Sequence, residues 1–394
     1  MDKIMKTLTF FSNYFNHHQE ALCNAFYSLL GDGFTFVETE PMEEFRSEMG
    51  WGREAPSYVL KSYASDENYD KALDLGLNSD VVIMGTAPEL FIEERLERNR
   101  LTFRYSERPL KEGRIKVLIP RLAKKFYHNH YRNRNKELYI LAAGAYCASD
   151  YRFLRSYLGK CYKFGYFPEG EKLSYEKLRR LKDRNRIPRI LWAGRFIKLK
   201  RPDLFLKAAK KCRDEGFDFQ IIFVGDGKEE KKIKRLVKSF HLCDRTLFKG
   251  FLSPEETREE MERADIFVMT SNHLEGWGSV IYEALSAGCA VIATHVAGAT
   301  PFLIQSGHNG FIFQSGSLDS LTGRLRTLLQ DRNLMKQMGR RAYFNMKERW
   351  NPRVAAVRFI ELSEALLKGE KKNFASGPLS RAPYILQKNY QDRP

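Results

Sequence analysis

The fold is decided by residues 266–283, which read IFVMTSNHLEGWGSVIYE. Their first five residues form an apolar run as long as a buried strand, and Gly276 and Gly278 favour a tight loop after it. A helix is expected from Ser279. Glycines let backbone approach a ligand closely, and the first N–H groups of a helix can bind an anion. The stretch therefore predicts a strand, a loop and a helix that together bind a phosphate.

Two carboxylates flank this helix start: Glu275 in the loop, and Glu283 about one turn inside the helix. Carboxylates accept hydrogen bonds from the hydroxyls of sugar and ribose, so the stretch has the groups needed to bind a nucleotide sugar. An ordinary strand–loop–helix crossover with solvated glutamates would show the same pattern, because short motifs also arise by chance.

The spacing of the two glutamates resembles the E-x7-E motif of family 4 glycosyltransferases, which are retaining enzymes of the GT-B fold. Residues 284–294, ALSAGCAVIAT, are similar to that family's EA-x-A-x-G-x-P-V-I-A-T segment, with Ala290 in place of the usual proline. The resemblance implies that the donor-binding residues here are Glu275, Gly276, Trp277, Gly278, Ser279, Val280 and Glu283.

A second element joins Gly194-Arg195 to Lys200 across a predicted strand-to-helix loop. Two cations at this spacing can converge on one diphosphate, although exposed basic residues are common in so basic a chain. The element resembles the family's G-R-x4-K motif. The resemblance implies that Arg195 and Lys200 neutralise the leaving nucleoside diphosphate and that they are catalytic together with Glu275.

Two further glycine turns follow predicted strands. Residues 224–227, VGDG, match the family's V-G-x-G motif, although a simple turn would read the same. Residues 248–252, FKGFL, resemble a strand end where the family's backbone groups contact the base. These matches add Gly225, Gly250 and Phe251 to the expected donor site, and several matches in family order are hard to obtain by chance.

The length of 394 residues exceeds that of a single core and predicts two domains. Strands alternate with helices, so the expected class is α/β, with two Rossmann-like domains facing a cleft. We expect an acceptor domain at 1–170, a linker at 171–188 and a donor domain at 189–349. The C-terminal helix and tail, about 350–394, are expected to complete the first domain.

The composition indicates where the protein works. Six cysteines without a C-x-x-C pair argue for reduced thiols and against a zinc site. No apolar run is long enough to span a bilayer, and the first residues lack the apolar core of a signal peptide. We therefore expect a cytoplasmic protein, with the inner face of the membrane as one place of action.

Charge is unevenly distributed in the sequence. Residues 1–100 hold 9 Lys/Arg against 18 Asp/Glu, whereas residues 101–200 hold 26 against 8. The most basic part, 111–136, interleaves nine cations with apolar and aromatic residues. It is expected either to contact anionic lipid or to form a helix with a solvated basic face. Nucleic-acid binding is not expected, since no recognition motif is present.

The first domain departs from the family pattern. Asn16, His17 and His18 stand in place of the usual glycine-rich loop, and Glu107 follows a later strand where many members have a histidine. Polar residues at strand ends are where such sheets bind ligands, so these four are acceptor-side candidates, with His17 and Glu107 also as catalytic candidates. The alternative is that Glu107 pairs locally with Arg108 and that the histidines cap a helix.

The resemblance implies a retaining, metal-independent hexosyltransferase. It would move a sugar from a nucleotide sugar, with UDP as the expected nucleotide, to a glycan or lipid-linked saccharide in cell-surface polysaccharide synthesis. No D-x-D sequence occurs in the chain, so we expect no metal ion and no cofactor besides the nucleotide sugar. The alternatives are an epimerase of the same fold, which would also bind a UDP-sugar, and a non-catalytic partner subunit.

Overall fold

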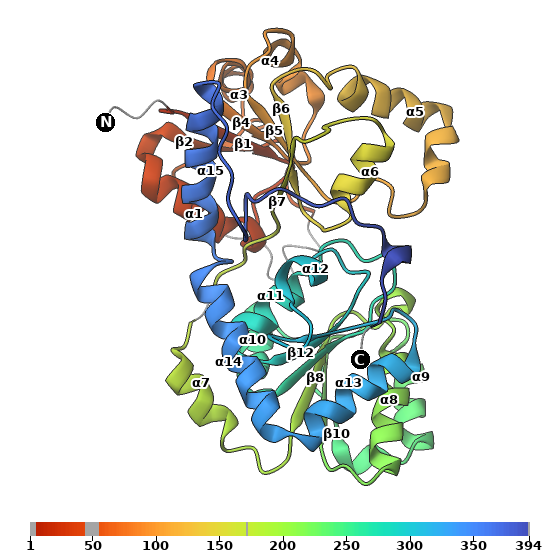
Figure 1. Ribbon diagram of the computed structural model, residues 1–394. Coiled ribbons are helices and arrows are strands. Elements are labelled where there is room, and N and C mark those ends of the chain that lie inside the picture. Colours follow the sequence, from red (N-terminus) through yellow and green to blue (C-terminus); the bar gives the residue numbers. More distant parts are fainter. Residues whose placement is uncertain (1–4, 44–54, 171, 393–394) are drawn as a thin grey trace. The chain divides into compact units, whose positions relative to one another are not determined.

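The computed structural model describes residues 5–43, 55–170 and 172–392 (Figure 1). The chain divides into two compact units. The first comprises residues 1–169 and 350–385, and the second comprises residues 170–349 and 386–394. Each unit has its own parallel sheet covered by helices, so both are Rossmann-like α/β domains.

The first unit is built on a parallel sheet in the order β3-β2-β1-β4-β5-β6-β7. Its strands are mostly continuous apolar runs, because helices cover both faces of the sheet. The strands are β1 (Leu8–Ser12), β2 (Phe34–Glu38), β3 (Val59–Lys61), β4 (Val81–Met84), β5 (Thr102–Ser106), β6 (Leu138–Ala142) and β7 (Cys161–Lys163).

Helix α15 returns from the end of the chain to pack beside α1 (Figure 1). The ring of Phe359 lies 5.4 Å from that of Phe26 on α1 and 4.8 Å from that of Phe103 on β5. This closing helix therefore belongs to the core of the first unit. The helices of this unit are α1 (His17–Leu30), α3 (Asp66–Asn78), α4 (Glu93–Glu97), α5 (Pro120–Phe126), α6 (Cys147–Phe153) and α15 (Pro352–Leu367).

The second sheet has the order β10-β9-β8-β11-β12-β13 and is also parallel. The chain proceeds outward from β8 in one direction and then from β11 in the other, so the strand order reverses between these two neighbours. Ligands of such sheets bind at the carboxyl ends of the strands at this switch point. The strands are β8 (Arg189–Ala193), β9 (Gln220–Val224), β10 (Thr246–Phe248), β11 (Ile266–Met269), β12 (Ala290–Thr294) and β13 (Phe311–Phe313).

Helices on both faces bury this second sheet. Apolar side chains of α8 and α13 pack with the strands in one core cluster that includes Phe205, Phe223 and Leu325. The helices are α7 (Tyr175–Lys182), α8 (Pro202–Asp214), α9 (Glu230–Ser239), α10 (Pro254–Arg263), α11 (Ser279–Ser286), α12 (Thr300–Leu303), α13 (Leu318–Gln330) and α14 (Arg332–Glu348). Of the helices in the described part of the chain, none is both long and apolar enough to cross a bilayer.

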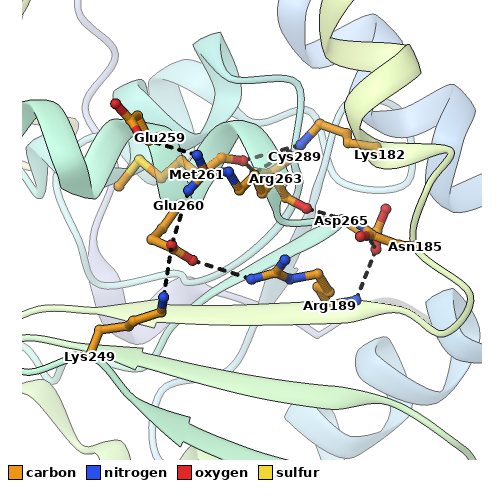
Figure 2. A network of polar contacts seen from close by, with 10 residues as sticks. All are labelled: Lys182, Asn185, Arg189, Lys249, Glu259, Glu260, Met261, Arg263, Asp265 and Cys289. Atoms are coloured by element: carbon orange, nitrogen blue, oxygen red, sulfur yellow. Dashed lines mark hydrogen bonds and ion pairs between the residues drawn. The ribbon is translucent and has the colours of Figure 1, made fainter.

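The predicted linker, 171–188, is corrected by the structure, because much of it is helix α7 packed on the second unit. Leu178 of α7 is buried, and the ammonium of Lys182 donates to the carbonyl oxygen of Met261 at 3.2 Å. Asn185 donates to the carboxylate of Asp265 at 2.9 Å (Figure 2). The segment is mostly charged in sequence, yet these contacts make it part of the second unit.

The same network fixes the amino-terminal edge of the second sheet (Figure 2). The carboxylate of Glu260 lies 3.3 Å from Arg189, 3.5 Å from Lys249 and 3.3 Å from Arg263. Asp265 accepts the backbone N–H of Arg189 at 2.8 Å. These contacts tie α10 to the starts of β8 and β11, which holds the two strands that carry the switch point.

The tail prediction is also corrected in part. Residues up to 385 belong to the first unit, where the N–H of Leu379 donates to the carbonyl of Lys163 on β7 at 2.8 Å. Residues 386–392 instead pack on the second unit. The ring of Tyr390 stacks on that of His295 with centroids 4.4 Å apart, and Gln387 donates to the carbonyl of Val296 at 3.1 Å. Ring stacking and a hydrogen bond explain this second attachment.

Candidate functional site

The loops that follow β8 and β11 lie at the switch point of the second sheet. Two hydrogen bonds join these loops. The backbone N–H of Asn272 donates to the carbonyl oxygen of Leu199 at 2.8 Å, and the side-chain hydroxyl of Thr270 donates to the carbonyl oxygen of Lys200 at 2.8 Å. The Thr270 hydroxyl also accepts the indole N–H of Trp192 at 3.1 Å. Sequence reasoning did not single out these contacts, because it placed Thr270 at the end of the predicted strand, whereas β11 ends at Met269.

These contacts bring Lys200 and Glu275 together. The ammonium of Lys200 lies 2.7 Å from Oε2 of Glu275, and only 19% and 11% of the two side chains are exposed. The two residues were predicted separately, Lys200 for a diphosphate and Glu275 for sugar hydroxyls. In the structure they form one partly buried ion pair, which places a cation and a carboxylate side by side at the sheet edge.

Three of the predicted glycines meet at the ends of β8, β9 and β10. The N–H of Gly225 donates to the carbonyl of Gly250 at 2.7 Å, and that of Gly194 to the carbonyl of Val224 at 3.0 Å. A Cβ on Gly225 would lie 2.2 Å from the carbonyl oxygen of Gly194, and the φ of Gly225 is +115°. Only glycine fits there, so backbone groups line this edge.

Helix α11 begins at Ser279, as expected, with Gly278 as its N-cap residue at φ +86°. Gly278 supplies no side-chain cap, and a Cβ there would lie 2.8 Å from the terminal carbon of Met269. The first N–H groups, of Ser279 and Val280, are therefore not capped by a side chain. A helix start of this kind binds anions through its N–H groups and its dipole.

Glu283 lies one turn into α11. Burial raises the pKa of its carboxyl group, and the positive charge of Arg258 opposes that shift. A carboxylate removed from water at this position gains from hydroxyl donors supplied by a ligand.

The other predicted donor residues differ in where their side chains lie. Arg195 is exposed, and within the described ranges no ion pair of its guanidinium is found. Phe251 has 48% of its side chain exposed, beside the glycine-lined edge. Trp277 is 1% exposed and its ring packs edge-on against Phe302, so its side chain belongs to the core. Its carbonyl accepts the N–H of Ala299, and that of Gly276 accepts the N–H of Gly298, each at 2.9 Å.

In the first unit, the acceptor-side candidates gather at the carboxyl ends of β1, β5 and β7. The hydroxyl of Tyr166 donates to Glu107 at 3.1 Å, and the Tyr166 ring lies 5.9 Å from that of His18. The rings of His17 and His18 are 3.9 Å apart. Burial, followed by the charge of His17, lowers the pKa of His18 to about 3, so His18 is neutral near pH 7.

The contacts differ from the alternative reading, in which the histidines cap a helix and Glu107 pairs with Arg108. Asn16, rather than a histidine, caps α1, because its side chain accepts the N–H of His18 at 2.9 Å. Arg108 pairs with Asp150 at 2.9 Å, and Glu107 instead forms a local ion pair with Lys111 at 3.6 Å. Sequence reasoning missed Tyr166; its position just after β7 was the available signal.

The basic segment 111–136 is neither a single helix nor buried. It forms a 3-10 turn (Arg114–Leu118), α5 and a π turn (Tyr127–Tyr131). Its apolar side chains face solvent among the cations: Ile115 is 71% exposed, Leu118 76%, Ile119 48% and Tyr127 52%. Exposed apolar residues between cations are typical of an interfacial element.

Comparisons with known proteins concern the family and the fold. Residues 176–344 match the family model described as glycosyl transferases group 1. The N-acetyl-alpha-D-glucosaminyl L-malate synthase of Bacillus anthracis is 29% identical over 182 residues, which are 46% of each chain. The sulfoquinovosyl transferase SQD2 of Arabidopsis thaliana is 31% identical over 180 residues, 44% of this chain and 34% of that protein. The chain thus spans less than half the length of these relatives.

Among solved structures, HepE of Anabaena in complex with UDP covers 93% of this chain and 100% of its own, with a TM-score of 0.65 and 16% identity. At that identity the likeness concerns the fold. The family match confirms the resemblance to family 4 that the E-x7-E motif indicated. Residues 176–344 are thus similar to the group 1 glycosyl transferases, and the two Rossmann-like domains of the chain are those of the GT-B fold.

Proposed function

We propose that this protein transfers a hexose from a UDP-sugar, with retention of configuration, to a hydroxyl of a glycan or lipid-linked saccharide. The observation that carries the proposal is the ion pair of Lys200 and Glu275 at the switch point of the second sheet. It adjoins a glycine-capped helix start, so groups for a diphosphate and for sugar hydroxyls occur together.

Each group has a stated part in binding the donor. Lys200, Arg195 and the first N–H groups of α11 bind the diphosphate, whose charge grows as it leaves. Glu283 accepts the ribose hydroxyls and Glu275 the sugar hydroxyls. The backbone at Gly250 contacts the base and the exposed Phe251 ring covers it. HepE, the Anabaena protein of like fold, was solved with UDP, which supports UDP here.

In the reaction, the bond between the anomeric carbon and the diphosphate oxygen breaks, and a bond from that carbon to the acceptor oxygen forms. The electron pair of the broken bond goes to the diphosphate, where the cations stabilise it. The acceptor proton passes to the departing oxygen on the same face of the sugar, which gives retention. We propose that Lys200, Arg195 and the helix dipole supply this stabilisation without a metal ion.

We propose that the first unit binds the acceptor. Its support is the cluster of His17, His18, Tyr166 and Glu107 at the carboxyl ends of three strands, where parallel sheets bind ligands. We further propose that residues 111–136 contact anionic lipid at the inner face of the membrane. Exposed apolar side chains between nine cations support that contact, and a lipid-linked acceptor would be found there.

The proposal is tested by thermal unfolding of the full chain with UDP, GDP, ADP and their sugars, with and without EDTA. A ligand at a hundred times its dissociation constant adds about 2.7 kcal/mol to the free energy of unfolding. We expect one UDP-sugar to stabilise the wild type in EDTA and to lose its effect in Glu283→Ala. The matched control is Glu348→Ala, which removes an exposed glutamate of the same unit.

Product analysis then separates the remaining functions. Transfer to an acceptor with retention supports the proposal, whereas conversion of the donor sugar without any acceptor identifies an epimerase. Donor binding without either reaction identifies a non-catalytic subunit. If no nucleotide sugar stabilises the wild type, the donor site assigned here is wrong.

A further inference from the structure

The first unit contains a second candidate site, away from the acceptor-side cluster. It is a pocket of about 680 Å³ whose cationic side chains are Arg134, Arg155 and Lys160. The remaining lining residues are Tyr131, Asn135, Tyr157 and Leu158. No Asp or Glu is among the residues that line it, so every charged lining residue is a cation. The carboxylate of Glu137 acts on Lys160 from outside the lining.

The pocket lies at the opposite edge of the sheet from the proposed acceptor site. Arg134 and Asn135 precede β6, which starts at Leu138, and Lys160 directly precedes β7, which starts at Cys161. Because all strands of this sheet are parallel, these residues mark the amino-terminal edge, whereas Glu107 and Tyr166 follow the ends of β5 and β7. The pocket is therefore a separate site.

Hydrogen bonds from neighbouring residues fix the position of the residues that line the pocket. The hydroxyl of Tyr157 lies 2.8 Å from Nδ1 of His130, and Asn129 donates to Glu89 at 2.8 Å. Glu89 in turn binds the guanidinium of Arg104 through two hydrogen bonds of 2.8 and 2.6 Å. The π turn that carries Tyr131 is thereby fixed to the sheet.

The backbone that presents two of the lining residues is left-handed. Arg155 has a φ of +51° and Tyr157 a φ of +55°, a region that costs energy for residues other than glycine. Glycine would remove that cost but would also remove the exposed guanidinium of Arg155 and the buried ring of Tyr157 behind the pocket. Strained backbone of this kind is concentrated at sites that bind ligands.

The cations differ in how far they are engaged. Arg134 donates to the carbonyl of Tyr131 at 3.1 Å, and its guanidinium lies 4.1 Å from the centre of that ring. Lys160 donates to the carbonyl of Lys136, and burial lowers the pKa of its ammonium group. Arg155 is exposed, and the described residues show no ion pair for it. Among the described residues that line the pocket, no carboxylate pairs with any of these three cations.

We propose that this pocket binds a phosphate monoester or diester, with Arg155 and Arg134 as the principal donors and the ring of Tyr131 against its carbon portion. Guanidinium groups match phosphate oxygens with paired N–H donors. The pocket shares Tyr131, Arg134 and Asn135 with the basic segment 111–136, and its lining residue Leu158 is 60% exposed. The phosphate belongs either to a lipid headgroup or to a soluble ester.

The test measures binding of glycerol 3-phosphate to the full chain by calorimetry at low salt, with glycerol as the uncharged comparison. The pocket variants are Arg155→Asn, since asparagine tolerates the left-handed region, and Arg134→Gln. Arg121→Gln removes one exposed cation of the same segment outside the pocket and is the matched control. Any phosphate binding near α11 would be the same in the wild type and the three variants. Differences in affinity among these four proteins therefore measure binding to the pocket.

We expect each pocket variant to weaken glycerol 3-phosphate binding at least tenfold and the control to change it less than twofold. Equal loss in Arg121→Gln, or no loss in both pocket variants, would overturn the site. Flotation with phosphatidylglycerol and phosphatidylcholine vesicles then identifies the source of the phosphate. Loss of phosphatidylglycerol binding in the pocket variants beyond that in the control indicates a lipid headgroup, and unchanged vesicle binding indicates a soluble ester. UDP-sugar binding in the same variants separates this site from the donor site.

Discussion

The ammonium of Lys200 lies 2.7 Å from Oε2 of Glu275, and the two residues follow neighbouring strands although they are 75 positions apart in the sequence. An ammonium has three N–H donors, and this contact uses one of them. Lys200 can therefore hold Glu275 in position and still donate to a phosphate oxygen. Under the proposed function, the ion pair would hold the carboxylate for the sugar hydroxyls without competing with the donor.

Removing either member of this pair should impair turnover more than folding. We expect Lys200→Ala to lower kcat/KM by about 10²–10³, as loss of one preorganised donor to a developing charge does. The matched control is Lys198→Ala, which removes an exposed cation of the same loop. A control loss of similar size would show that general positive charge, and not the position of Lys200, matters.

The coupling within the pair is measured separately by urea unfolding of Lys200→Ala, Glu275→Ala and the double variant. Because both side chains are less than a fifth exposed, we expect a coupling energy of about 0.5–3 kcal/mol. Additive effects of the two single substitutions would mean that the pair contributes nothing to stability.

The close approach of Gly225 to Gly194 predicts a large difference between two glycine substitutions. Gly225→Ala places a methyl group 2.2 Å from a carbonyl oxygen at a φ of +115°, so we expect a loss of about 3 kcal/mol or more. Gly216 has a φ of +89° with open space around it, and Gly216→Ala should cost only about 1–2 kcal/mol. Chemical unfolding of both variants measures the difference. Equal losses would indicate that backbone strain alone is responsible.

The contrast between local and long-range features explains what the sequence could predict. The strands of the second sheet were predictable because each is a short apolar run between turn residues, as at Ile266–Met269. The loop with Gly278 was predictable because its glycines and the helix start lie within a few residues. The Lys200–Glu275 contact was not, since no local pattern indicates which of many charged residues meet across 75 positions.

Elements with few buried residues also could not be predicted from the sequence. Strand β3 (Val59–Lys61) is three residues long with no fully buried side chain, so it lacks an apolar signal. Helix α7 has Leu178 as its buried residue among charged neighbours and therefore resembled a linker. In the first unit, no local pattern distinguishes Tyr166 from the aromatic residues before it. Its hydrogen bond to Glu107 depends on where β5 and β7 end.

The attachment of the tail to the second unit predicts a stability loss far from the catalytic residues. Tyr390→Ala removes the stack on His295 and the hydrogen bond from the tyrosine hydroxyl to the carbonyl of Ile312 at 3.1 Å. A ring pair and a hydrogen bond each contribute about 0.5–1.5 kcal/mol, so we expect a loss of about 1–3 kcal/mol. Lys388→Ala, an exposed tail residue, is the control. An unchanged urea midpoint in Tyr390→Ala would show that the tail does not stabilise this unit.

The raised pKa of Glu283 predicts how stability depends on pH. Burial raises the pKa of this carboxyl group in the folded protein above its ordinary value of 4.5, so the folded state binds the proton more tightly than the unfolded state. The free energy of unfolding therefore falls as pH rises from 4.5 through the folded pKa. Glu283→Gln abolishes this titration. We expect the variant to match the wild type below pH 4.5 and to be the more stable protein near pH 7.

The same substitution should reverse this order when donor is present, a result that rests on the proposed function. The ionised Glu283 would accept ribose hydroxyls, whereas the amide is a weaker acceptor, so a UDP-sugar should stabilise the wild type more than Glu283→Gln. Urea unfolding from pH 4 to 8, with and without ligand, measures both effects, and Glu348→Gln should follow the wild type throughout. If Glu283→Gln gains no stability at pH 7 without ligand, burial does not penalise the carboxylate. If it gains stability but binds donor as well as the wild type, Glu283 does not contact the ribose.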